Sequence, residues 1–136
     1  AFKADVGKHI KDIAEKYIIT GETADSAITT PRTVSIHNAT AWATLWGEHY
    51  ATVAPRPPLP TVDFNKEQVL GVFLGTRGNG CYGVEIRKLV QTASTRTVVY
   101  HETTPGPTST CTAALTMPTH LVRASASALP VTFRAE

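Results

Sequence analysis

The residues with the widest range of possible chemistry lie in one glycine-rich segment, Gly71–Ile86. Within it, Gly78-Asn-Gly80-Cys-Tyr-Gly83 matches G-x-G-x-x-G, in which a loop and the following helix N-terminus hold the pyrophosphate of a dinucleotide. That site needs a helix directly after the loop and an acidic residue about 20 positions later. Here Val84–Val90 alternates with a period of two, which is typical of a strand. We therefore expect no dinucleotide and no other cofactor.

The two cysteines, Cys81 and Cys111, allow two interpretations. A cysteine near a histidine can act as a nucleophile, so a small enzyme with a Cys/His site is one hypothesis. A disulfide between the two cysteines is the simpler interpretation, and it favours an exported protein. The chain lacks C-x-x-C and H-E-x-x-H, and no two of its five histidines share a helix face, so we predict neither metal ligands nor catalytic residues.

Composition narrows the class of protein. The chain has 136 residues and a net charge of +2, which suits a single domain spanning 1–136. Its lysines and arginines form no run, so no nucleic-acid partner is expected. No stretch approaches the roughly 18 apolar residues that cross a bilayer. The start without methionine, together with the cysteine pair, predicts a secreted or periplasmic protein.

One amphipathic helix is expected at about residues 40–50. Its apolar stripe, at i, i+3, i+4 and i+7, consists of Trp42, Leu45, Trp46 and His49, and it should pack on a sheet. Asn38 or Thr40 can cap the helix. Four prolines in 55–60 then predict a stiff polyproline II strap over the surface; its P-x-x-P spacing leaves an SH3-type ligand as an alternative.

The rest of the chain is predicted to be mostly strands. A short helix within 1–13, a strand at 17–20 ending in a turn, and a loop at 21–30 make the N-terminal 1–30 the less well specified part. The β-rich core, 31–136, holds strands at about 33–37, 68–74, 82–86, 95–101, 112–115, 120–124 and 131–133. The fold class is therefore mainly β (α+β): a β-sandwich or barrel-like domain of six or more strands with one packed helix.

Between two of these strands lies a glycine-rich loop that we interpret as a hairpin. Its glycines permit tight backbone conformations, and Arg77 and Asn79 offer hydrogen-bond donors near its tip. Held at its base by a disulfide, such a loop could recognise a partner; a plain turn with no partner is the alternative. The predicted partner-binding residues are Gly75, Thr76, Arg77, Gly78, Asn79, Gly80 and Tyr82.

The order of these motifs resembles the C-terminal domain of the bacterial PrcB family of protease-complex or protease-stability subunits. The likeness covers about 31–125: Trp42-Ala-Thr-Leu-Trp46, the proline strap, Val62-Asp-Phe64, Gly71-Val-Phe-Leu-Gly75, the Gly80-Cys-Tyr-Gly83 run and the late Ala114-Leu-Thr-Met-Pro-Thr-His-Leu-Val122. Arg77–Tyr82 departs from the family pattern of a proline and paired glycines before the tyrosine. The resemblance implies export, a non-enzymatic role and association with a secreted protease. A weaker likeness, limited to the Gly-any-Tyr ending of the loop, is to chagasin-type protease inhibitors.

The leading hypothesis is therefore an exported binding domain that stabilises or inhibits a secreted protease through the glycine-rich loop. A Cys/His enzyme and a structural or surface-display module without a protease partner are the alternatives. The sequence leaves open which protease is bound and what the oligomeric state is.

Overall fold

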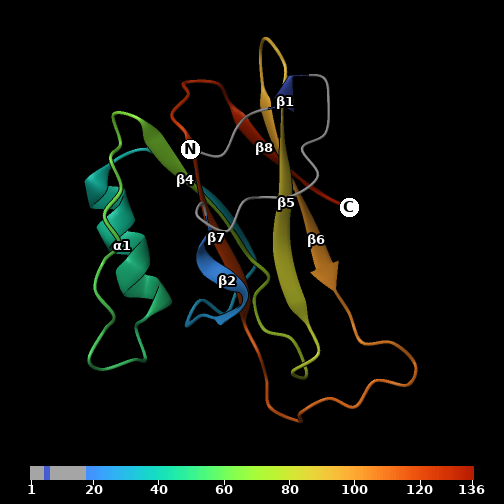
Figure 1. Cartoon of the computed structure of the whole chain (residues 1–136). Coiled ribbons are helices and arrows are strands. Elements are labelled where there is room, and N and C mark those ends of the chain that lie inside the picture. The colour runs from blue at the N-terminus through green and yellow to red at the C-terminus, as the bar shows by residue number, and fades with distance from the viewer. Residues whose placement is uncertain (1–4, 7–17) are drawn as a thin grey trace.

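The computed structural model describes residues 5–6 and 18–136 and shows two four-stranded sheets packed face to face (Figure 1). Sheet A has the strand order β2-β7-β4-β3 and sheet B the order β1-β5-β6-β8. The predicted mainly β class is confirmed, and the architecture is a sandwich rather than a closed barrel. The strands are β1 (Asp5–Val6), β2 (Ile18–Asp25), β3 (Arg32–Ile36), β4 (Glu67–Phe73), β5 (Gly83–Gln91), β6 (Arg96–Thr103), β7 (Pro118–Ser125) and β8 (Val131–Ala135).

Pairing within sheet A is antiparallel throughout. In sheet B, β5 and β6 are antiparallel, whereas β1 and β8 add to them in parallel. Two segments connect the sheets at one end of the molecule, 74–82 between β4 and β5 and 104–117 between β6 and β7. With 26–31, which joins β2 to β3, they form what we call the loop end (Figure 1). The opposite end carries the β5–β6 turn at 92–95, and we call it the far end.

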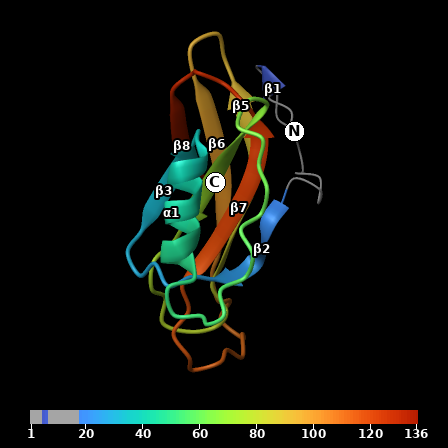
Figure 2. The same ribbon diagram turned by 90° about the vertical axis from the view of Figure 1, so that its left-hand side faces the viewer.

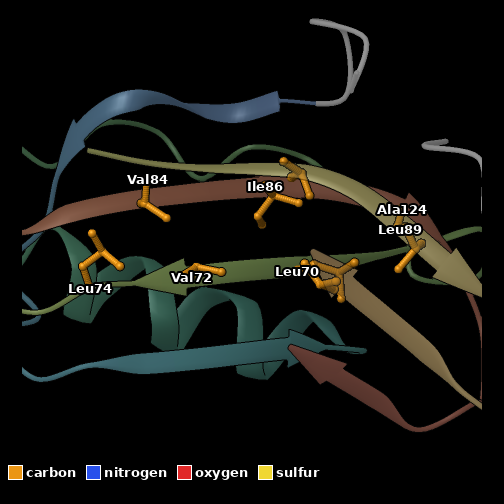
Figure 3. Close-up of a cluster of buried hydrophobic side chains, with 9 residues drawn as sticks. Leu70, Val72, Leu74, Val84, Ile86, Leu89 and Ala124 are labelled. Carbon is orange, nitrogen blue, oxygen red and sulfur yellow. The ribbon is translucent and has the colours of Figure 1, made fainter. Parts of the chain in front are cut away.

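The main core fills the space between the sheets, where alternate residues of each strand point inward. Figure 3 shows aliphatic side chains of β4 and the following residue facing those of β5. The buried members are Leu70, Val72, Leu74, Val84, Ile86, Leu89, Val98, Val122 and Ala124. Because both sheets contribute, neither would be stable without the other.

The other face of sheet A is covered by α1 (Ala39–His49), the one helix of the described residues, which lies within one residue of the predicted range (Figure 2). The side chain of Asn38 caps it by accepting a hydrogen bond from the Ala41 N–H at 2.8 Å, so Asn38 rather than Thr40 is the cap. The predicted stripe of Trp42, Leu45, Trp46 and His49 is buried, as expected. Its tryptophans and leucine pack with Val69, Phe73 and Leu121 of the sheet.

The proline-rich strap is held against α1 by the two tryptophans. The indole N–H of Trp42 donates to the carbonyl of Pro60, and that of Trp46 donates to the carbonyl of Pro57, both at 2.9 Å. Buried indole nitrogens need a partner, and a proline-rich backbone has carbonyls without competing N–H groups. The strap is therefore part of the helix packing, in agreement with the structural interpretation.

Four sequence predictions are wrong in part. Residues 112–115 form a loop rather than a strand, because the disulfide and inter-sheet crossing place them outside both sheets. β2 continues through Gly21 to Asp25, so the strand does not end in a turn there and 21–25 is not loop. Asp5–Val6 is strand β1, not helix; the other residues of 1–13 lie outside the described part. The glycine-rich loop joins strands of different sheets, so it is a crossover and not a hairpin.

No helix among residues 5–6 and 18–136 is long and apolar enough to span a membrane.

Candidate binding site

The predicted partner-binding residues lie in the connection 74–82, at the loop end beside the long connection 104–117 (Figure 1). Both connections carry the chain from one sheet to the other. Neither connection is closed by the continuous hydrogen-bond ladder of a hairpin, so other interactions must hold each in place.

A disulfide and backbone hydrogen bonds tie the two connections together. Cys81 and Cys111 are bonded, with their Cα atoms 5.3 Å apart, so the predicted disulfide is confirmed. Arg77 and Thr116 exchange backbone hydrogen bonds of 2.7 and 3.1 Å, and the Gly80 N–H donates to the Thr112 carbonyl at 3.1 Å. With its sulfur in this bond, Cys81 is not a free thiol, which contradicts the hypothesis of a Cys81 nucleophile.

The start of the loop is fixed against 26–31, the third segment of the loop end. Gly75 has φ +77°, and a Cβ there would lie 2.8 Å from the Pro31 nitrogen and 2.9 Å from the Thr29 carbonyl oxygen. Only glycine fits both this backbone conformation and this close approach. The N–H of Thr76 then donates to the same Thr29 carbonyl at 3.0 Å. The loop is therefore attached to a neighbour on each side.

Arg77 was predicted to contact a partner, but its guanidinium forms hydrogen bonds within the fold. Its Nε donates to Glu102 Oε2 at 2.8 Å and its Nη1 to the Leu74 carbonyl at 2.9 Å. Both ion-pair side chains are only 28% exposed. The hydrogen bond that Arg77 donates to Glu102 raises the pKa of Arg77; the negative charge of Glu102 adds to this effect and partial burial opposes it. The loop's one charge is thus neutralised by β6.

The other polar anchor, Asn79, is also used internally, since its Oδ1 accepts the Cys81 N–H at 2.9 Å. By contrast, Gly78 is exposed, and a Cβ placed there would meet no atom within 4 Å. Thr76 and Gly80 are exposed as well, although a Cβ on Gly80 would collide with the Thr112 hydroxyl. The exposed part of the loop is therefore centred on Gly78, whereas the Arg77 guanidinium and the Asn79 Oδ1 are engaged within the fold.

Tyr82 contributes to a pocket at the base of the two connections. The pocket has a volume of about 260 Å³. It is lined by Gly80, Cys81, Tyr82, Gly83, Val84, Thr103 and Thr116. Its mixed backbone, aromatic and hydroxyl lining could accept one side chain of a partner.

Sequence reasoning missed the contribution of 104–117. This connection contains no charged residue, and neither does 26–31. Leu115, one residue before the Thr116 bridge, is 64% exposed, more than any other large apolar side chain in the described part. The disulfide prediction implied that this segment would neighbour the glycine-rich loop, but the mistaken strand at 112–115 hid the exposure of Leu115.

In the part of the chain that the structure describes, no group of three or more His, Cys, Asp or Glu side chains could hold a metal ion. Two histidines are instead buried in the packing. His49 lies against Trp46 and Phe73, and the Nδ1 of His120 accepts the Ile86 N–H at 2.8 Å.

Together, the fold and site define a helix-covered β-sandwich in which the two inter-sheet connections of the loop end are crosslinked into one surface. Residues 68–125 match the model of the PrcB C-terminal family, which confirms the predicted family resemblance over this range; its extension to 31–67 stays a prediction. The match runs from β4 to the end of β7, so it includes both connections and both cysteines but not α1 or the strap. It relates this part of the chain to a domain of protease-complex subunits. No curated protein and no solved structure matched the chain.

Proposed function

We propose that the chain is an exported, non-enzymatic domain that binds a secreted protease through its loop end and stabilises or inhibits it. The observation that carries this proposal is the crosslinked pair of connections, in which internal bonds fix the backbone and neutralise the single charge. A surface fixed before binding loses little conformational entropy on association, which favours affinity.

The chemistry of the surface supports a protein partner. Leu115 and the lining of the Tyr82 pocket offer apolar contact, and exposed threonine, serine and glycine residues surround them. Protein interfaces are depleted in charge at their centres, as this surface is. The disulfide supports export, because disulfides persist in oxidising compartments, and the family match supports a protease as the partner.

Substituting Gly78 with tryptophan tests the proposal, because the space around Gly78 is open and the larger side chain should block a partner without disturbing the fold. Ala93→Trp is the matched control: Ala93 is exposed in the β5–β6 turn at the far end. Immobilised wild-type protein and both variants would be incubated with culture fluid of the organism that carries the gene. Captured proteins would be identified and quantified by mass spectrometry.

We expect the wild type and Ala93→Trp to capture a protease, and Gly78→Trp to capture at least tenfold less at an unchanged melting temperature. Equal capture by Gly78→Trp would show that the loop is not the contact. Capture of no protease would favour the structural or surface-display alternative. Activity of the captured protease with and without the domain then distinguishes stabilisation from inhibition.

A further inference from the structure

The two open sides of the sandwich differ in the regularity of their edge strands (Figure 2). On one side, β1 has two residues and the pairing of β2 with β7 contains two register shifts. On the other, β3 and β8 each pair over five residues without a shift. Soluble proteins usually protect edge strands by shortness, bulges, prolines or charges. The side formed by β3 and β8 is therefore protected neither by a two-residue strand nor by a bulge.

Of the two regular edges, β3 is the less protected. Each strand carries one arginine within its paired length, Arg32 in β3 and Arg134 in β8. Arg32 is the first residue of β3 and is paired with Glu48, and from Thr33 to Ile36 the strand contains no charge, proline or glycine. Val34 and Ile36 pack beneath α1. The alternation of a strand therefore turns Thr33 and Ser35 toward the side of sheet B. An unprotected edge of this kind can accept another strand.

The backbone groups of β3 that face away from the sheet can be assigned from the register. The Leu74 N–H donates to the Pro118 carbonyl, so alternate residues of β4 counted back from Leu74 point their backbone groups toward β7. Val69, Gly71 and Phe73 consequently face β3, where their partners are Ile36, Val34 and Arg32.

Thr33 and Ser35 are left with their N–H and C=O groups pointing outward. Among the described residues, β3 pairs only with β4, and no other strand lies beyond it. This edge therefore offers two amide donors and two carbonyl acceptors, spaced as an added strand requires.

A groove lies beside this edge, between β3 and the strands of sheet B. Its volume is about 310 Å³, and Val72, Leu74 and Tyr100 give it apolar walls. The arginines that border it are both paired, Arg32 with Glu48 at 3.1 Å and Arg77 with Glu102 at 2.8 Å. The groove is thus suited to uncharged side chains.

We propose that β3 binds an extended, uncharged peptide segment of a partner protein, which joins sheet A as a fifth strand and places alternate side chains in this groove. A second copy of the chain fits less well, because its β3 would present only the small side chains of Thr33 and Ser35 to the groove. The inference goes beyond the loop contact and does not depend on it.

Substitutions at Ser35 test the proposal with a matched pair. Ser35→Pro removes an outward N–H without removing a bond to β4, and proline is tolerated on edge strands. Ser35→Val keeps the N–H. Both variants lose the Ser35 hydroxyl contact to His37 at 2.9 Å, so that loss cancels in the comparison. Peptides from a phage-displayed library of random ten-residue sequences would be selected on the wild-type protein and their affinities measured for all three proteins.

We expect selected peptides to bind Ser35→Val like the wild type and Ser35→Pro at least tenfold more weakly. Hydrogen exchange of the Thr33 and Ser35 amides should slow at least tenfold when a selected peptide binds; this measurement decides the question if Ser35→Pro does not fold. Failure to select peptides, equal binding to Ser35→Pro, or protection confined to other amides would each overturn the proposal. So would sedimentation showing a wild-type dimer that Ser35→Pro dissociates, since the occupant would then be a second copy.

Discussion

At the far end of the sandwich polar side chains turn into the core, whereas at the loop end they hold connections together near the surface. Arg96, 1% exposed, fills the far end: its guanidinium donates to the Ser125 carbonyl at 2.6 Å, the Ser125 hydroxyl at 2.8 Å and Gln91 Oε1 at 2.9 Å. At the loop end, Arg77 remains partly exposed and pairs with a carboxylate.

The difference shows what each end can be used for. A buried cation without a carboxylate partner, as Arg96 is among the described residues, can only be tolerated if the surrounding oxygens keep their positions. The far end is therefore built for stability. At the loop end, the disulfide and the Arg77–Glu102 pair fix the backbone while leaving Gly78 and Leu115 available for contact.

The largest effect on stability is expected at the far end, from Arg96→Ala. The substitution removes the donors to partly buried oxygens of Ser125 and Gln91 and opens a cavity where the buried Arg96 side chain lay, so the free energy of unfolding should fall by about 3–5 kcal/mol. Urea unfolding measures this change. Protease capture by the loop end should persist at a temperature where the variant is folded. Arg96→Lys is the control for charge, and it should recover only part of the loss because lysine lacks the forked guanidinium geometry. A loss below about 1 kcal/mol for Arg96→Ala would contradict the structural role of this end.

The second largest effect on stability is expected at the loop end, from the double variant Cys81→Ser, Cys111→Ser. The bond closes a sequence separation of 30 residues, so its removal should lower the free energy of unfolding by about 3–4 kcal/mol on the chain-entropy estimate. The loop end should also loosen in the native state. Faster hydrogen exchange at the Gly80 and Thr116 amides, with unchanged exchange in β6, would show this. Uniform change across both ends would mean that the disulfide does not act locally.

Much of the architecture could be predicted from local patterns. The stripe on α1 has the helical period, and the strands of the core alternate or run continuously apolar, so each was found within a few residues. The pairing of Cys81 with Cys111 was the simpler of two interpretations, because the chain has only these two cysteines and no metal-ligand spacing. These features are predictable because they depend on neighbouring residues or on a single possible partner.

The site was harder to predict because its contacts join distant segments. Nothing near Arg77 in the sequence indicates that Glu102, 25 positions away, will neutralise it. The crossover of 74–82 between sheets depends on which strands pair, a non-local property that alternation does not encode. The same limit applied to 112–115, where a β-like composition gave a strand that the disulfide and sheet crossing exclude.

The smallest of the three stability effects is expected from His120, a buried histidine of β7 on the loop-end side of the core. His120 is 1% exposed, and desolvation lowers its pKa to about 4 despite the nearby charge of Glu85. Its neutral Nδ1 accepts the Ile86 N–H, an interaction that protonation would abolish. Arg96, although its pKa is also lowered by burial, stays charged at all ordinary pH values. Moderately acidic pH should therefore weaken the contribution of His120 to stability and leave that of Arg96 unchanged.

The direction of the pH effect on stability follows from the pKa of His120 in the folded and the unfolded protein. Unfolded histidine binds its proton near pH 6.5, whereas folded His120 does so only near pH 4, so the unfolded state gains protons first as the pH falls. The stabilisation is complete above pH 6.5 and is lost progressively toward pH 4, by about 3 kcal/mol at about 1.4 kcal/mol per pKa unit. His120→Asn keeps an acceptor for the Ile86 N–H without this titration. Urea unfolding of both proteins from pH 7.5 to 4 removes the shared contribution of the carboxylates. The wild type should lose more stability than His120→Asn across this range, while parallel curves would show that His120 is protonated in the folded core.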